Sequence, residues 1–543
     1  MRNLLTALLF FLAGNTTAQV NYIFYNGKIF TSDKTTPWVE AIAIGGNRIM
    51  AIGKNEEILK LKTSSAQTID LAGRVMVPGF NDAHDHVGPV YPAHRFEIAK
   101  NITDPTPWTV ILDSISRIVK EVPEGTFIIT TIHPDLFSNP GNNSGDLDRV
   151  APHHPVMLSA WTGHGKILNS SALKFLGYDS NAEFLGGRVL KLKNGEPSGV
   201  LEEYAGFRVP AVLSSKLSDK IIADGLKSFY ANAAAMGITS VQNMCTQLNA
   251  EQTNRIYTTE QFDCRVRLIA FPFTSHKELL LNDWANHFHP LNKKNEVSGV
   301  KLILDATPIE RLAALSQPYN DKPGEFGRIN FAADQLKIFI DFCIKHQQQI
   351  IIHAVGDSAI KMLIKTMRSI QPDDFWKNKR VRIEHGDLAV VNDSDLQTLS
   401  NLGIIIVQNP THLALPQVMH QHFGPERMKT TDLMRTLIDN NIPLAIGSDG
   451  PNNPFLNIML ATINPNNPKE AISIEEAVRA YTIGSAYAEG KEKEKGSLTK
   501  GMLADLTILS QDIFSVPTQQ LPATQSILTM VDGKIVHDKK LLR

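Results

Sequence analysis

Short runs of consecutive apolar residues recur along the middle of the chain, and longer stretches with helical spacing separate them. Seven of the runs cover residues 237–241, 266–270, 300–304, 349–353, 381–385, 403–407 and 443–447, and an eighth ends at His84 and His86. A short apolar run bounded by polar residues is typical of a strand that is buried on both faces. Eight such strands alternating with helices predict an α/β fold, a TIM (β/α)8 barrel over residues 79–496.

The first two predicted strands are separated by more chain than any other neighbouring pair. Residues from about 95 to 228 are rich in proline, glycine and turn signals. Because barrels of this kind diversify by lengthening the loops that follow their strands, this segment is expected to form a subdomain inserted over the barrel mouth.

Both ends of the chain have a different pattern, with short strands and tight turns. Asn26-Gly27 and Asp532-Gly533 each separate two apolar runs, as in a β-hairpin. Two such pieces on either side of a long α/β middle predict one small β-sandwich domain, built from residues 19–78 and 497–543.

Residues 1–18 have the composition of a secretory signal peptide. Arg2 supplies a positive charge, residues 4–13 are almost entirely apolar, and small or polar residues follow as far as Ala18, although Thr16 departs from the usual cleavage pattern. No later stretch reaches the roughly 20 apolar residues that a membrane span needs. The prediction is a secreted or periplasmic protein cleaved after Ala18. The alternative is a cytoplasmic protein with a disordered or buried N-terminus.

Composition narrows the classes of function. The 543 residues are 43% hydrophobic with a formal net charge of −1, which excludes a disordered chain and gives no electrostatic reason to expect nucleic acid as a partner. The chain has 17 histidines but only 3 cysteines, which lie in apolar stretches and are expected to be buried free thiols: Cys245, Cys264 and Cys343. Any metal site is therefore expected to use imidazole and carboxylate ligands.

Two histidines end the first predicted strand, in the segment Pro78-Gly79-Phe80-Asn81-Asp82-Ala83-His84-Asp85-His86. Because side chains alternate along a strand, His84 and His86 share a face and can converge on one ion, with Asp82 one pleat earlier and Asp85 pointing away. Alone, this pair is a weak signal, since two histidines often fall at this spacing by chance.

Other predicted strands end in residues of the same chemistry. His353 ends the fifth apolar run, His385 ends the sixth, and Asp449 follows Gly447-Ser448 after the eighth. The carboxyl ends of barrel strands form one rim, where such barrels hold their chemistry. Four histidines and an aspartate on that rim predict a metal centre.

Lys301 lies within an otherwise apolar fourth strand, residues 299–304. Burying an ammonium group is costly unless the lysine is paired, deprotonated or modified. Either Lys301 extends towards solvent or pairs with Asp305, or its neutral amine takes up carbon dioxide and becomes a carbamate that bridges two metal ions.

Taken in order along the chain, these residues resemble a known family. The motifs are Pro-Gly-Phe-x-Asp-x-His-x-His, Lys301, Ile352-His353-Ala354-Val355-Gly356-Asp357, Ile383-Glu384-His385 and Gly447-Ser448-Asp449. They look like the amidohydrolase superfamily and, more narrowly, its amidohydrolase 3 branch, called YtcJ-like. The resemblance extends to residues 195–203 and 501–506, and it is broken at Asp305-Ala306, where that branch usually has Asp-Gly.

The resemblance implies a barrel beside a β-sandwich, holding one or two divalent ions, zinc first, with iron, manganese or nickel as alternatives. The implied metal ligands are His84, His86, Lys301, His353, His385 and Asp449. The resemblance favours Lys301 as a carboxylated bridging ligand. Glu203, in the inserted segment, is the rival bridging carboxylate or a substrate contact.

The ligand set also suggests a mechanism. A divalent ion lowers the pKa of bound water from about 15.7 towards 7, so that hydroxide can attack a substrate carbonyl. Asp449 is expected to carry the proton to the departing nitrogen. His412 and His164 either orient the carbonyl or bind substrate, or are ordinary loop residues. Glu384 and Asp357 are expected to hold imidazoles or to form salt bridges.

The predicted function is a metal-dependent hydrolase that cleaves a C–N amide-type bond in a small molecule, either an N-acyl or N-formyl amine or a cyclic amide. A deaminase or isomerase on the same barrel is the alternative, because a fold does not fix the reaction. A non-catalytic binding protein would be expected to have lost metal ligands, and none is missing. The sequence is also compatible with a homodimer.

Overall fold

The computed structural model describes residues 19–98 and 105–542. The predicted signal peptide, residues 1–18, lies outside the described residues and stays a prediction. Among the residues described, no helix is both long enough and apolar enough to cross a membrane. The three cysteines are buried and unpaired, as predicted.

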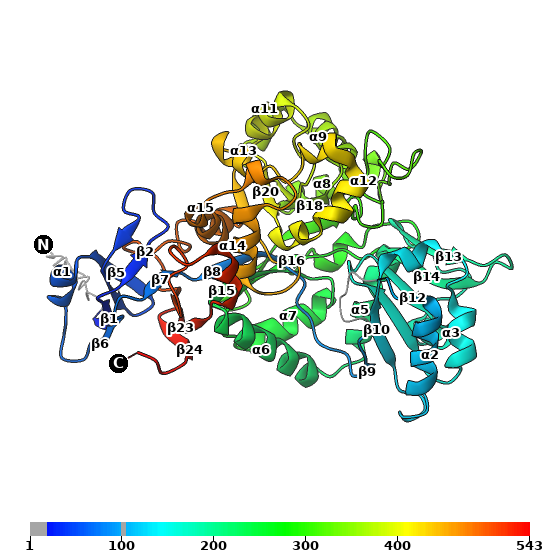
Figure 1. Cartoon of the computed structure of the whole chain (residues 1–543), viewed down its shortest axis with the longest axis horizontal. Coiled ribbons are helices and arrows are strands. Elements are labelled where there is room, and N and C mark those ends of the chain that lie inside the picture. Colours follow the sequence, from blue (N-terminus) through cyan, green and yellow to red (C-terminus); the bar gives the residue numbers. More distant parts are fainter. Residues whose placement is uncertain (1–18, 99–104, 543) are drawn as a thin grey trace, which may run out of the picture.

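Eight parallel strands form a barrel in the middle of the molecule (Figure 1). In chain order, each pairing with the next, they are β8 (Phe80–Asp85), β15 (Ile238–Met244), β16 (Arg265–Ala270), β17 (Asn295–Ile303), β18 (Ile350–Ala354), β19 (Arg382–His385), β20 (Ile405–Gln408) and β21 (Leu444–Ile446). The last strand approaches the first, since the Asp449 N–H donates to the His84 carbonyl at 2.9 Å. The predicted TIM barrel is confirmed.

Gly447 permits this approach. A Cβ atom at that position would lie 2.4 Å from the His84 backbone nitrogen, so only glycine allows the chain after β21 to lie against the end of β8. The glycine of the Gly-Ser-Asp motif thus brings two ligand-bearing strand ends together.

Helices cover the outside of the barrel, and the strands are buried on both faces. The helices are α6 (Asp219–Ala235), α7 (Ala250–Thr259), α8 (Ala333–Lys345), α9 (Asp357–Ile370), α11 (Asp393–Leu402), α12 (Pro416–Met428), α13 (Met434–Asp439), α14 (Pro454–Ile463) and α15 (Ile474–Arg479). Strands β15 and β16 are buried at every position, which explains why the sequence shows continuous apolar runs.

Strands from both chain ends form two sheets beside the barrel. The four-stranded sheet has the order β5 (Arg48–Gly53), β4 (Ala41–Gly45), β1 (Val20–Tyr25), β6 (Gln67–Asp70). The six-stranded sheet has the order β24 (Lys534–Asp538), β23 (Ser526–Val531), β22 (Leu506–Leu509), β7 (Val75–Pro78), β2 (Lys28–Phe30), β3 (Trp38–Val39). Arg265 of β16 makes ion pairs with Asp505 and Asp532 at 2.6 and 2.7 Å, which fasten these sheets to the barrel.

The long segment after β8 forms a third extra sheet, at the right in Figure 1. Its order is β13 (Gly187–Lys191), β14 (Pro197–Glu203), β12 (Gly165–Leu168), β11 (Val156–Ala160), β10 (Ile128–Ile132), β9 (His94–Arg95). Helices α2 (Trp108–Ile118) and α3 (Ser144–Val150) pack on one face, and α4 (Ser170–Leu176) and α5 (Tyr204–Ser215) pack on the other. Tyr204 of α5 stacks on Phe271 of the barrel with ring centroids 5.3 Å apart, so the insertion is anchored beside the mouth.

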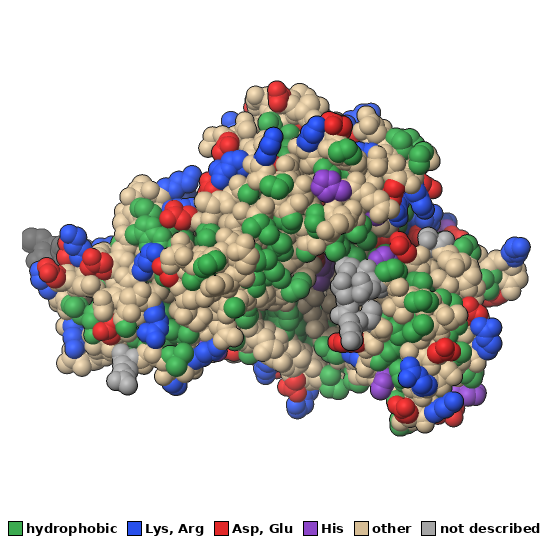
Figure 2. All heavy atoms as spheres, viewed as in Figure 1, with side chains coloured by type: hydrophobic (Ala, Val, Ile, Leu, Met, Phe, Trp, Pro, Cys, Tyr) green, Lys and Arg blue, Asp and Glu red, His purple; other side chains and the backbone are tan. Residues whose placement is uncertain are grey.

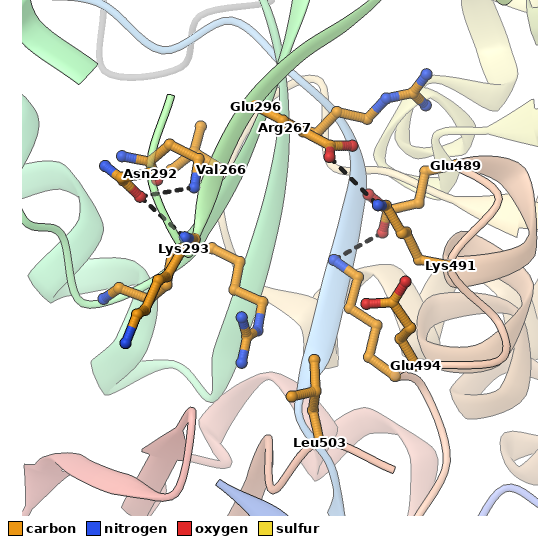
Figure 3. A pocket seen from close by; sticks show the side chains of 13 residues that line it. Val266, Arg267, Asn292, Lys293, Glu296, Glu489, Lys491, Glu494 and Leu503 are labelled. Atoms are coloured by element: carbon orange, nitrogen blue, oxygen red, sulfur yellow. Dashed lines mark hydrogen bonds and ion pairs between the residues drawn. The ribbon is translucent and has the colours of Figure 1, made fainter. Parts of the chain in front are cut away.

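A cavity of about 80 Å³ lies at the opposite, amino-terminal end of β16 and β17 (Figure 3). Ion pairs cross it: Lys491 to Glu296 at 3.2 Å and Lys495 to Glu489 at 2.8 Å. The first pair joins the barrel to the segment that leads into the C-terminal strands, and Lys495 of that segment also donates to Ser240 Oγ of β15 at 2.8 Å. Their role is therefore structural.

Candidate metal centre and active site

His84 and His86 approach each other as the strand alternation predicts. Their Nε2 atoms lie 3.3 Å apart. The other ring nitrogen of each is already engaged, because His84 Nδ1 lies 2.6 Å from the Glu384 carboxylate and His86 Nδ1 lies 2.9 Å from Thr246 Oγ1. Both histidines therefore direct Nε2 into one space.

The Asp449 carboxylate lies at the centre of that space. Its Oδ1 is 3.5 Å from His86 Nε2 and 3.7 Å from His84 Nε2. Its Oδ2 is 3.7 Å from His412 Nε2 and 3.8 Å from His385 Nε2. The backbone of Asp449 has a φ of +40°, a left-handed conformation that is uncommon for aspartate and clusters at functional sites. One carboxylate thus faces imidazoles from three strand ends.

Two buried imidazole nitrogens of this cluster have no hydrogen-bond partner within the described residues: His353 Nε2 and His385 Nδ1. The rings of these two histidines touch edge to face, with centroids 4.4 Å apart. An unpaired buried nitrogen is costly, whereas its lone pair suits a divalent cation. The donor set fits such an ion, since ligand atoms lie within 4.8 Å of one another in two groups: His84, His86, Asp449 and His385, His412, Asp449.

Burial keeps these imidazoles in the form that binds metals. It lowers the pKa well below the ordinary value in three of them: His84, His353 and His385. For His86, burial and the nearby Lys301 ammonium lower the pKa to about 3, and for His412 burial lowers it to about 4. A neutral imidazole offers a lone pair without first releasing a proton.

Lys301 lies among the histidines and is 1% exposed, with Nζ 3.4 Å from His84 Nε2. Asp305, one partner considered from the sequence, is engaged elsewhere, because it accepts the backbone N–H groups of Ala314, Val355 and Gly356. Burial lowers the pKa of Lys301 to about 8, which makes its neutral amine more available than in water. The side chain neither reaches solvent nor pairs with Asp305.

A buried ion pair stands behind His84. Arg382 and Glu384 are fully buried, and the Arg382 guanidinium donates to both Glu384 oxygens at 2.9 and 3.1 Å. Glu384 in turn receives His84 Nδ1, which fixes the tautomer and leaves Nε2 for a ligand role. The expectation that Glu384 holds an imidazole is met.

Replacing Glu384 by glutamine is expected to weaken metal binding about 10–100-fold, because His84 loses its charged partner. It should also lower the free energy of unfolding by about 3–5 kcal/mol, since Arg382 stays buried without a counter-charge. Competition with a chromophoric chelator and urea unfolding measure the two effects. Glu492→Gln, in the half-exposed pair with Arg380, is the control and should change stability by less than about 1 kcal/mol. Unchanged metal affinity in Glu384→Gln would contradict the positioning role.

His164 and Glu203, both from the insertion, face the cluster together. Glu203 is fully buried, and its two oxygens receive His164 Nδ1 at 2.9 Å and Asn330 Nδ2 at 3.0 Å. The His164 ring lies 5.4 Å from that of His353. With both of its oxygens engaged, Glu203 holds His164 in place, an arrangement that neither candidate role for Glu203 included.

A cavity of about 200 Å³ opens beside His164, between the insertion and the loop after β17. Phe137 and Leu312 supply apolar lining, and Glu310 and Arg311 supply charge. Figure 2 shows the surface hollowed between the barrel and the insertion, with histidine side chains at the edge of the hollow. His164 lines this cavity and its ring lies near that of His353, so the cavity borders the histidine cluster through His164.

Comparison with known proteins identifies the family. The sequence model described as "Amidohydrolase family" matches residues 67–537, which is most of the chain. The chain belongs to the amidohydrolase family. It is accordingly a hydrolase of a family that acts on small molecules, and its clustered histidines and Asp449 are groups that could hold a metal ion.

Relatives match this amidohydrolase over nearly their full lengths. Protein LONG AFTER FAR-RED 3 of Arabidopsis thaliana is 27% identical, with 94% of this chain and 91% of that protein covered. The N-substituted formamide deformylase of Arthrobacter pascens is 24% identical, with 95% and 98% covered. The crystal structure of an uncharacterized metal-dependent hydrolase from Pyrococcus horikoshii OT3 superposes with a TM-score of 0.71 at 20% identity, covering 92% of this chain and 99% of the other, which supports the fold.

Of the two roles predicted for Asp357, the structure shows the salt bridge. Asp357 is the first residue of α9 and pairs with Lys361 at 2.7 Å, and it also binds Ser316. Arg382 and Asn330 were not predicted, although each supports a carboxylate that holds a histidine. Arg382, a charged residue inside an apolar run, was a signal for the first; Asn330 lies in an irregular segment that offers none.

Proposed function

We propose that this amidohydrolase cleaves the C–N bond of an amide-type small molecule, an N-formyl or N-acyl amine or a cyclic amide. The observation that carries the proposal is the convergence of the histidines and Lys301 on the Asp449 carboxylate at the barrel mouth. The full-length similarity to the N-substituted formamide deformylase of Arthrobacter pascens supports an N-formyl amine as the first substrate to test.

The residues that would hold one or two divalent ions, zinc first, are His84, His86, Lys301, His353, His385 and Asp449. We include Lys301 as a carboxylated lysine, because its buried amine lies at the cluster and Glu203 is already bonded through both oxygens. A bound divalent ion supplies a Lewis acid and lowers the pKa of a coordinated water molecule.

The chain's own groups then position the substrate and move the proton. The Asp449 side chain is 20% exposed, so a substrate in the opening can reach its carboxylate. The carboxylate can hold a proton at one oxygen and hand it to the nitrogen that leaves. His164 is tied through Nδ1 to Glu203, so its Nε2 is the atom available to the cavity and can orient the substrate carbonyl. His412, 42% exposed on its side chain, lies across the opening and is placed to contact the substrate as well.

A side-by-side assay with the zinc-loaded protein tests the proposal. The panel holds an N-alkylformamide, an N-acetyl amino acid, a hydantoin and an aminopurine, with formate, acetate, free amine and ammonia measured separately. We expect amide cleavage that a chelator abolishes and added zinc restores, with His86→Ala inactive as the control. Ammonia release from the aminopurine alone, with every amide intact, would favour the deaminase alternative instead.

A further inference from the structure

Three loops meet around two buried aspartates outside the histidine cluster. Asp387 follows β19, Asp432 precedes α13, and Asn466 follows α14. The Asp432 N–H donates to the Asp387 carbonyl at 3.1 Å, and Asn466 Nδ2 donates to Asp432 Oδ2 at 3.0 Å. Asn464 Nδ2 also donates to the Asp432 carbonyl at 3.0 Å. Residues far apart in the chain are thus packed into one polar site.

The polar atoms of this site are short of partners. Asp387, Asp432 and Asn466 are 8%, 5% and 4% exposed, respectively. Within the described part of the chain, the Asp387 carboxylate has no hydrogen-bond donor or cationic side chain as a partner, and the charge that acts on it most strongly is that of Asp432. The buried Asn466 Oδ1 also has no hydrogen-bond partner. The unpaired oxygen therefore belongs to a side chain whose amide nitrogen touches the Asp432 carboxylate.

Asp387 and Asp432 are in contact through their backbones, and two buried carboxylates on contacting residues repel each other unless a positive charge lies between them. Among the residues that the structure describes, no lysine or arginine pairs with Asp387 or Asp432. The available atoms are carboxylate and amide oxygens without any imidazole or thiolate, which is the donor set that hard cations prefer. A cation would pair the Asp387 carboxylate and the Asn466 oxygen at once.

We propose that Asp387, Asp432 and Asn466 Oδ1 bind a hard divalent cation, calcium or magnesium, at a second site separate from the histidine cluster. Asp387 lies two residues after His385, and Gly386 between them has a left-handed φ of +62°. The cation would tie the loop that follows His385 to the loops around α13 and α14. Its role is to stabilise the chain rather than to take part in hydrolysis.

Isothermal titration of the zinc-loaded, full-length protein with calcium chloride, and separately with magnesium chloride, tests this site. We expect one equivalent of one of the two ions to bind, and its saturation to raise Tm by at least about 2 °C. Asp387→Asn and Asp432→Asn should each weaken that binding about tenfold or more. Asp393→Asn, at an exposed aspartate of α11, is the matched control and should keep the full response.

Two results would overturn the proposal. In the first, the wild type binds neither ion, and Asp387→Asn is at least as stable as the wild type. This result would mean that the two carboxyl groups share a proton instead of binding a cation. The other is undiminished binding in both site variants. His84→Ala should retain the calcium or magnesium response while losing zinc, which separates this proposal from the proposed hydrolase function.

Discussion

The Lys301→Ala variant is expected to lose its divalent metal and to fall in kcat by on the order of 10³-fold. Lys301 Nζ lies 3.4 Å from His84 Nε2, and the side chain is only 1% exposed, so its removal leaves a gap within the cluster. If the lysine amine adds to carbon dioxide and loses a proton, the resulting carbamate supplies two oxygens to the metal site. Truncation to alanine leaves room for a small carboxylic acid, so acetate or propionate should restore part of the metal content and turnover.

Three measurements check this result: metal analysis of the purified protein, turnover with and without added acid, and 13C NMR after supply of 13C-bicarbonate. The wild type should show a carbamate carbon signal that Lys301→Ala lacks. Lys495→Met is the control, because Lys495 is another largely buried lysine, paired with Glu489 at the far end of the barrel. Full metal content in Lys301→Ala would contradict the prediction. If Glu203→Gln lost its metal while Lys301→Ala kept it, the bridging role would belong to Glu203.

The barrel and its rim could be predicted from the sequence because two strong constraints coincide there. Strands buried on both faces must be continuously apolar, so β15 to β21 are visible as runs. Polar residues such as His353 and His385 then stand out at the strand ends, and parallel strands bring those ends to one rim. Lys301 stands out for the same reason, as a charge inside an apolar strand.

Pairings between loops could not be predicted, because they depend on register and on irregular chain. His164 and Glu203 were both recognised as candidates, but their contact follows from the antiparallel pairing of β12 with β14, where Gly165 lies opposite Glu202. Asn330 belongs to a stretch between β17 and α8 that has no periodicity. For Asp357 the sequence left two roles open, because its position next to a ligand motif is also the first turn of a helix, where an acidic residue is stabilised by the helix dipole. The structure shows the salt bridge, with Lys361.

The Asp449→Asn variant is expected to keep most of its metal and to lose about 10²–10⁴-fold in kcat. Asparagine retains an oxygen among the imidazoles, since Asp449 Oδ1 and Oδ2 lie 3.5–3.8 Å from four of them. It cannot hold the proton that an amine needs in order to leave. Steady-state kinetics and metal analysis on the same preparation separate the two effects.

The leaving group gives a sharper test of Asp449. If its carboxylate hands a proton to the departing nitrogen, then the loss of kcat in Asp449→Asn should be smaller for anilides than for alkyl amides, because the amines of anilides leave more easily. If Asp449 acted only as a structural group or a metal ligand, the substitution would lower the turnover of both substrates by the same factor. Asp357→Asn is the matched control, because that carboxylate also follows a ligand-bearing strand but binds Ser316 and Lys361, and its turnover should stay close to that of the wild type. Unchanged turnover in Asp449→Asn would remove the proton-transfer step from the mechanism.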